Sequence, residues 1–119
     1  DKLEQIKTVR NENFLLYRKF IKNNRLDLRV DKEDFISNFA YPLVHERRAE
    51  IVKELQENNI EIRPIIAGSM GKKPFWIKEY GETILPNAEI IDNFGIYIPN
   101  HHELKRADIE LISYIVNKY

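Results

Sequence analysis

The sequence predicts an α/β fold, a two-layer α+β sandwich in which helices cover a small mixed or antiparallel sheet of three to four strands. Two observations support this fold class. Segments with helical periodicity lie at both ends of the chain, at residues 3–22 and 105–119, and a third lies at 46–57. Short β-branched runs separate these segments, and one of them starts at Ile60, directly after the third helix. The 119 residues and the apolar fraction of 43% suit a single domain with its own core.

The composition argues against several classes of function. Nineteen basic and nineteen acidic residues cancel, so no basic excess favours a nucleic-acid partner. No apolar run approaches the roughly 20 residues of a membrane span, so no membrane partner is expected. The absence of cysteine excludes disulfides and thiolate metal sites, and three histidines alone do not predict a zinc site. A chain without cysteine fits a reducing compartment, and we expect a cytoplasmic protein.

The first third of the chain predicts one helix and two strands. Residues 3–22 carry an apolar stripe that Arg10 and Asn13 interrupt in the middle. This helix opens without a clear N-cap, and the chain starts at Asp1 and not at Met, so we expect a part of a longer protein. Alternating apolar residues predict a strand at 26–30. A second strand is predicted at 37–44, where Pro42 favours a sheet edge or a bulge.

The middle of the chain predicts a helix at 46–57 and a strand at 60–66. This strand–helix–strand order is compatible with a parallel crossover, whereas the remaining pairings are expected to be antiparallel. Arg63 is the one charge among the isoleucines of the second strand, and a buried charge is costly unless it is paired. Its partner could be a structural carboxylate or a phosphate or hydroxyl of a substrate.

The strand at 60–66 leads into a loop of small residues at 67–71, whose glycines permit close approach of other groups. A short helix or an irregular turn follows at 73–80. Asn87 is expected to cap another short helix that Gly95 ends, and a strand is predicted at 96–98. In the loop that follows, consecutive side chains point in opposite directions, so one of His101 and His102 can face a site while the other faces solvent.

Seven short motifs occur in an order that resembles one known family. They are Asn38-Phe-Ala-Tyr-Pro-Leu43, Glu57-Asn-Asn-Ile-Glu-Ile-Arg-Pro64, Ala67-Gly68, Lys73-Pro-Phe75, Leu85-Pro-Asn-Ala88, Gly95-Ile-Tyr-Ile-Pro-Asn-His101 and Asp108-Ile109. Over about eighty residues this set resembles the C-terminal small domain of the pyridoxal-phosphate-dependent sugar-nucleotide aminotransferases and dehydratases, the DegT or StrS family. The segment before Phe35 matches only as a long helix and a strand.

The resemblance implies the small domain of a fold type I enzyme, with residues 1–24 as a linking helix and 25–119 as the domain. In this family the pyridoxal phosphate sits mainly on a preceding large domain. That domain carries the cofactor-binding Lys of the aminotransferases, or the His that replaces it in the 3-dehydratases. No catalytic residue is therefore assigned in this chain, and none of its lysines is assigned as the cofactor lysine. The resemblance also implies a homodimer in which the small domain closes over the cofactor.

The resemblance further implies which residues meet the substrate. Arg63 and the loop residues Gly68, Ser69 and Met70 would face the substrate pocket, and Asn100 and His101 would line it from the end of the next strand. Their polar contacts would orient sugar and phosphate groups. Two departures concern this pocket, because the family often has Asn at Ser69 and Gln at Lys73. Both departures bear on sugar specificity.

The function implied is transamination of a nucleotide-linked 4-keto-6-deoxysugar in the biosynthesis of deoxysugars and surface polysaccharides such as lipopolysaccharide. The alternative within the family is 3-dehydration of the same substrate class. The alternative from a different class is a non-catalytic α/β interaction module. A small domain separated from its large domain should be inactive, should not bind the cofactor tightly and should expose an apolar patch, whereas an autonomous module should bury its apolar faces.

Overall fold

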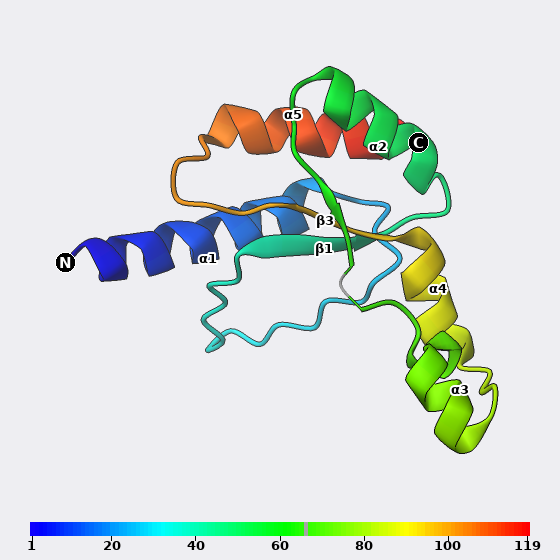
Figure 1. Ribbon diagram of the computed structural model, residues 1–119. Coiled ribbons are helices and arrows are strands. Elements are labelled where there is room, and N and C mark those ends of the chain that lie inside the picture. Colours follow the sequence, from blue (N-terminus) through cyan, green and yellow to red (C-terminus); the bar gives the residue numbers. More distant parts are fainter. Residues whose placement is uncertain (66) are drawn as a thin grey trace.

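The computed structural model describes residues 1–65 and 67–119 (Figure 1). The elements in chain order are α1 (Lys2–Phe20), β1 (Ala40–Val44), α2 (Arg48–Glu57), β2 (Arg63–Pro64), the 3-10 helix η1 (Met70–Lys72), α3 (Pro74–Tyr80), α4 (Pro86–Phe94), β3 (Gly95–Pro99) and α5 (Arg106–Asn117). The predicted helices at both ends and in the middle are confirmed within a few residues, as is the short helix at 73–80.

The sheet formed by the described residues has the strand order β1-β3-β2. β3 pairs antiparallel with β1, with Ile98 opposite Tyr41, and antiparallel with β2, with Tyr97 opposite Arg63. β1 and β2 therefore run in the same direction on the two sides of β3. The segment β1–α2–β2 is thus a crossover between strands that are parallel but are not neighbours, and the predicted small antiparallel sheet is confirmed.

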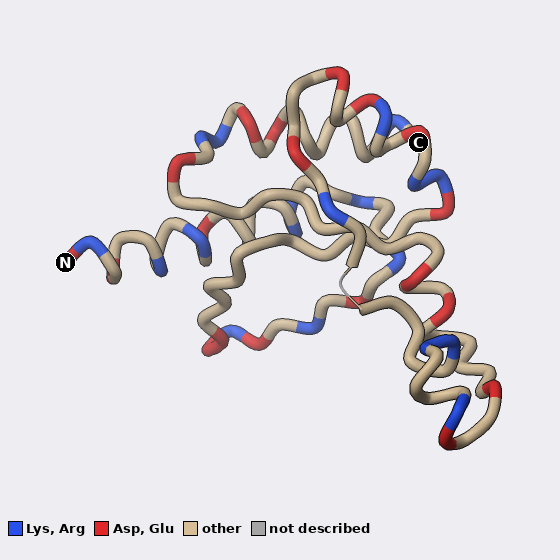
Figure 2. The backbone as a smooth tube through the Cα atoms, viewed as in Figure 1, with Lys and Arg blue, Asp and Glu red and all other residues tan. Residues whose placement is uncertain are grey.

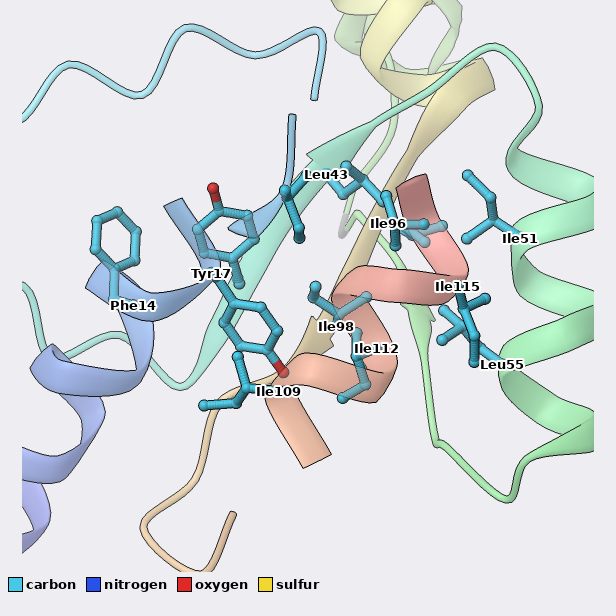
Figure 3. Close-up of a cluster of buried hydrophobic side chains, with 13 residues drawn as sticks. Phe14, Tyr17, Leu43, Ile51, Leu55, Ile96, Ile98, Ile109, Ile112 and Ile115 are labelled. Atoms are coloured by element: carbon cyan, nitrogen blue, oxygen red, sulfur yellow. The ribbon is translucent and has the colours of Figure 1, made fainter. Parts of the chain in front are cut away.

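The hydrophobic core lies between the sheet and the helices α1, α2 and α5 (Figure 3). Its apolar residues follow the expected periods, with Ile96 and Ile98 alternating on β3 and Ile109 and Ile112 three apart on α5. The buried cluster consists of Phe14, Tyr17, Ile21, Tyr41, Leu43, Ile51, Leu55, Ile96, Ile98, Ile109, Ile112, Ile115 and Val116. Residues from both ends of the chain therefore share one buried cluster.

Helix α1 begins with a cap that the sequence did not reveal. The Asp1 carboxylate accepts a hydrogen bond of 3.2 Å from the backbone N–H of Leu3, so the expectation of an uncapped start was wrong. One of the two polar residues that interrupt its apolar stripe, Asn13, is explained by a tertiary contact of its side chain. The Asn13 side chain is buried and donates to the His101 carbonyl at 3.1 Å, and the Arg10 carbonyl accepts from Asn100 at 3.0 Å.

The strand predicted at 26–30 does not form. Within the described residues, Asn24 already occupies the free edge of β1: its amide donates to the Pro42 carbonyl and its carbonyl accepts from the Val44 N–H, both at 3.1 Å. Pro42 itself has no N–H to offer, which is why it tolerates this edge position. Leu28 and Val30 still pack partly against the core, so their alternation reflects half-burial without strand pairing.

Three further boundaries differ from the prediction. The strand expected at 37–44 starts at Ala40, and the strand expected at 60–66 is reduced to Arg63–Pro64, with Ile66 outside the described residues. Asn87 is not an N-cap, because Pro86 is already the first residue of α4 and Leu85 precedes it as the cap. Gly95 does end this helix, as predicted.

Residues 69–85 form a lobe that extends from the sheet beside α4 (Figure 1). The lobe contains η1 and α3, and no residue of α3 is buried. Gly71 lies so close to this lobe's other end that an added Cβ would stand 2.0 Å from the Thr83 carbonyl oxygen. The Trp76 indole N–H also donates to the Thr83 hydroxyl at 3.0 Å, which closes the lobe on itself.

Candidate functional site at the diverging edge of the sheet

A cleft of about 670 Å³ opens where β2 and β3 separate. The two strands pair only through Arg63 and Pro64, so the chain at 60–62 diverges from Ile98 and Pro99 and leaves a gap beside the edge of β3. The lining comprises Phe39, Ala40, Asn58, Asn59, Ile60, Glu61, Ile62, Arg63, Tyr97, Ile98, Pro99, His101, Glu103, Leu104, Asp108, Leu111 and Ile112. An apolar floor with charged side chains around it is typical of a site for a polar small molecule.

Arg63 lies in this lining, but not as a buried charge. Its side chain is 73% exposed, and its guanidinium donates to the Glu61 carboxylate at 3.0 Å. The premise that Arg63 is enclosed by isoleucines was therefore wrong, because the short β2 is an edge strand whose side chain here points to solvent. Of the two partners considered for Arg63, the structure shows a carboxylate, at the surface, where an ion pair contributes little to stability.

His101 also lies in the lining, whereas His102 does not. The backbone of His101 is held by helix α1, because its carbonyl accepts a hydrogen bond from the Asn13 side chain. The structure thus brings Arg63 and His101 to one cleft from two segments that are far apart in the sequence. Asp108 belongs to the same lining, but its carboxylate already accepts from the Lys105 N–H at 2.8 Å and so caps α5.

Asn100 is wholly buried and does not line the cleft. Its side-chain amide donates to the carbonyls of Arg10 and Asn38, at 3.0 and 3.1 Å. The amide therefore joins helix α1 and the segment before β1 to the end of β3. In this chain Asn100 holds the backbone that carries His101, and it reaches the cleft only through that neighbour.

The loop residues Gly68, Ser69 and Met70 are not in the cleft lining either. Gly68 has a positive φ of 62°, and a Cβ there would stand 2.7 Å from the Asp92 carboxylate on α4. The loop is thus pressed against α4. The Ser69 side chain is buried, and its hydroxyl has no hydrogen-bond partner in the described part of the chain, while Met70 is exposed.

Two aromatic residues of the cleft were not predicted. Phe39 and Tyr97 stack edge to face with 5.8 Å between their ring centroids. Tyr97 alternates with the buried Ile96 and Ile98, so the period of the strand could have placed it away from the core. Phe39 precedes β1 and carries no comparable signal. Together the rings offer an apolar wall on which a base or a sugar could stack.

Charge and metal chemistry give no further site among the described residues. Basic and acidic side chains alternate along the chain, with no extended run of one sign (Figure 2). No group of three or more histidine, aspartate or glutamate side chains in residues 1–65 and 67–119 is placed to hold a metal ion. Within the same residues, none of the helices has the length and apolar character needed to cross a membrane.

Relatives of known structure share this architecture. The GDP-4-keto-6-deoxy-D-mannose-3-dehydratase of E. coli, solved with bound hydrated PLP, superposes with a TM-score of 0.75 at 24% identity, over 97% of this chain and 32% of that one. The aminotransferase PseC of Helicobacter pylori, involved in the biosynthesis of pseudoaminic acid, superposes with a TM-score of 0.72 at 21% identity, over 95% and 32% of the two chains. The chain therefore spans about a third of the length of these proteins.

A characterised relative is similar at the level of sequence. The GDP-4-keto-6-deoxy-D-mannose 3-dehydratase of Yersinia pseudotuberculosis is 42% identical over 57 residues, which is 45% of this chain and 14% of that protein. A model of the DegT/DnrJ/EryC1/StrS aminotransferase family matches residues 1–117. This match covers nearly the whole chain, including α1, β3 and the loop that carries His101. The chain therefore belongs to the DegT/DnrJ/EryC1/StrS aminotransferase family.

Proposed function

We propose that this chain is the C-terminal domain of a longer pyridoxal-phosphate-dependent enzyme that transfers an amino group to a nucleotide-linked 4-keto-6-deoxysugar. The observation that carries the proposal is the family match over residues 1–117. The TM-scores of 0.75 and 0.72 to a PLP-containing dehydratase and an aminotransferase support the same architecture. Since the chain spans about a third of these relatives, the activity would belong to the longer protein.

The residues of this chain do not form a pyridoxal phosphate site by themselves. None of the described residues that line the cleft is a lysine, and none of the eleven lysines of the chain is buried. When bound, this cofactor supplies an electron sink for bond changes next to an amine. The lysine or histidine that would meet it is proposed to lie in the part of the protein that precedes Asp1.

The proposed contribution of this domain is to bind and orient the substrate. Arg63 and His101 face the cleft, where the guanidinium could exchange the Glu61 carboxylate for a phosphate, and the imidazole could hydrogen-bond a sugar hydroxyl. Gly68, Ser69 and Met70 would contact the substrate from the loop beside α4. Asn100 is proposed to act indirectly, since it fixes the backbone of the segment that carries His101.

One observation favours a second candidate, the 3-dehydration of the same substrate class. The relative with 42% identity over 57 residues is a 3-dehydratase, and so is one of the structures with the same fold. The two reactions share the cofactor and the sugar. They differ in the residue that meets the cofactor, which this domain does not contain.

The setting of the enzyme is part of the proposal. We place it in the cytoplasm, as a homodimer, in the biosynthesis of deoxysugars for surface polysaccharides such as lipopolysaccharide. The equal numbers of acidic and basic residues agree with a soluble enzyme that binds neither nucleic acid nor a membrane.

The test uses the longer protein from which the chain comes. Its visible absorbance would be recorded after addition of pyridoxal phosphate, with and without borohydride. A yellow protein whose colour borohydride fixes on a lysine would support the aminotransferase. Bound cofactor that borohydride does not fix would favour the 3-dehydratase. Failure to bind the cofactor would overturn the proposal and leave the interaction module.

A further inference from the structure

The cleft and the loop at 68–70 lie toward opposite ends of strand β2. Because β2 runs antiparallel to β3, the chain before Arg63 lies beside the end of β3, whereas the chain after Pro64 leads toward the start of β3 and α4 (Figure 1). Arg63 belongs to β2 itself and therefore lies between the inner end of the cleft and the loop. A substrate that reaches the loop, Arg63 and the cleft together has to extend along β2.

The backbone of β3 gives a ligand in the cleft little to bind. The Asn100 N–H and the Phe94 carbonyl both bond to the chain at the two ends of β1, so the even-numbered residues of β3 turn their backbone groups toward β1. Beyond Tyr97, which pairs with β2, the described part of β3 turns only Pro99 toward the cleft. Pro99 has no N–H, and its carbonyl accepts from the Tyr17 hydroxyl at 2.8 Å. An added peptide strand would find no donor at this edge, so recognition in the cleft depends on side chains.

The side chains of the cleft combine an aromatic wall with a cation beside it. Phe39 is 63% exposed and meets Tyr97 edge to face, and every nucleobase has a flat face that can stack on such rings. Arg63 is the cross-strand partner of Tyr97, so the two side chains project from the same face of the sheet. A base on the wall would bring its phosphates to the Arg63 guanidinium, and the His101 imidazole, which also lines the cleft, could bind a ribose hydroxyl.

The reacting end of the substrate is less suited to the cleft than the nucleoside end. Most of the lining comes from three segments of this chain, at 58–63, at 97–104 and at 108–112 of α5. The carbonyl carbon of a 4-ketosugar has to meet a cofactor for which this chain provides no lysine among the described residues of the lining. The group bound between these three segments is therefore the one that does not react.

We propose that the cleft binds the nucleoside end of the nucleotide sugar. The base stacks on Phe39 and Tyr97, the diphosphate meets Arg63, and the hexose extends along β2 to the loop at 68–70. This inference rests on the proposed function and gives the bound substrate a direction. The reacting carbon then lies outside the cleft, beside the loop that is pressed against α4.

The test measures, by titration calorimetry of the longer protein, the dissociation constants of two probes, GDP and pyrophosphate. Phe39→Ser removes the stacking surface and should raise the Kd of GDP about tenfold, while the Kd of pyrophosphate stays unchanged. Arg63→Gln should raise both values. Phe35→Ser changes an exposed phenylalanine that does not line the cleft, and as the matched control it should change neither. A Kd of GDP that does not respond to Phe39→Ser would overturn the inference.

A third probe, mannose 1-phosphate, tests the direction of binding because it lacks the nucleoside. Its Kd should not change in Phe39→Ser, and a loss of affinity equal to or larger than that of GDP would overturn the inference in favour of the hexose. Visible absorbance with pyridoxal phosphate is recorded on the same samples. Bound cofactor with a GDP affinity that is independent of Phe39 overturns only the placement of the nucleoside. Absence of cofactor binding with a GDP affinity that depends on Phe39 overturns only the proposed function.

Discussion

The side-chain amide of Asn100 donates a hydrogen bond of 3.0 Å to the backbone carbonyl of Arg10, 90 residues earlier in the chain. Two further bonds run beside it, from the Asn13 amide to the His101 carbonyl at 3.1 Å and from the Tyr17 hydroxyl to the Pro99 carbonyl at 2.8 Å. Helix α1 is therefore joined to the end of β3 by a row of side chains, and the position of His101 in the cleft depends on that helix.

Replacement of Asn100 by Ala should destabilise residues 1–119 by roughly 2–4 kcal/mol, because a wholly buried side chain and its hydrogen bonds to the Arg10 and Asn38 carbonyls are lost. Urea denaturation measures the change in the free energy of unfolding. The exposed Asn87, replaced by Ala, is the matched control and should change it by less than about 0.5 kcal/mol. If Asn100 acted only by touching substrate, its replacement would leave the stability of this domain unaltered.

Replacement of Tyr17 by Phe should cost about 1–2 kcal/mol, the value of the lost hydrogen bond with the Pro99 carbonyl left unpaired. Burial raises the pKa of Tyr17 above its ordinary value, so the folded state holds this proton more tightly than the unfolded state. The contribution of Tyr17 to stability should therefore be constant below about pH 10 and should fall as the pH rises further. The variant should show a smaller fall in urea titrations above pH 10. The remainder is due to Tyr41, whose pKa burial raises, and to Tyr119 and Lys118, whose pKa values are raised by hydrogen bonds to Glu54.

Two glycines of the lobe allow the steric cost of an added Cβ to be compared with the cost of backbone strain. Gly71→Ala would place a Cβ 2.0 Å from the Thr83 carbonyl oxygen and should cost about 2–3 kcal/mol. Gly81→Ala meets nothing within 4 Å, but the φ of 77° and ψ of 171° at this position lie in a region that essentially only glycine adopts, so it should cost roughly 1–3 kcal/mol of backbone strain. Exchange rates of the Trp76 indole proton would report the lobe directly. Exchange of this indole proton that is no faster in Gly71→Ala than in Gly81→Ala would contradict the close packing of Gly71 against Thr83.

Arg63→Gln should leave the stability of the domain within about 0.5 kcal/mol of the parent, because the ion pair with Glu61 is exposed. In the longer protein the KM for the nucleotide sugar should rise about tenfold, as one charge-assisted hydrogen bond is lost. Arg29→Gln, which removes an exposed ion pair with Asp27 outside the cleft, is the control. A KM that does not move with Arg63 would remove this residue from the substrate site.

The elements that the sequence predicted well are those whose pattern is long. Helix α5 repeats buried apolar residues at Ile109, Ile112, Ile115 and Val116 over about two turns, which is enough to fix its type and its buried face. The strand at 26–30 shows where this reasoning stops. Its alternation is real, but a strand also needs a free edge, and Asn24 had taken the edge of β1 through contacts that no local pattern encodes.

The candidate site also depends on contacts between distant residues that local sequence patterns do not encode. The resemblance named Arg63 and His101, and the structure brings both to one cleft, although Arg63 is exposed and not enclosed. The resemblance also implied that Asn100 lines the substrate pocket, whereas the structure buries its side chain away from the cleft. Its burial depends on the Arg10 and Asn38 carbonyls, which lie 90 and 62 residues away in sequence. Phe39, which was not predicted, lines the cleft and contacts the ring of Tyr97.

Because helix α1 packs against helix α5, this domain cannot complete its core until α5 has been synthesised. Phe14 and Tyr17 of α1 join Ile109 and Ile112 of α5 in one buried cluster, so the residues of α1 are covered only after those of α5 have been synthesised. Contacts of such long sequence separation form slowly. Until the ribosome has released α5, the nascent domain has to keep α1 and the sheet partly open to the solvent and to chaperones. A stop codon just before residue 106 would remove α5 and with it one wall of this core.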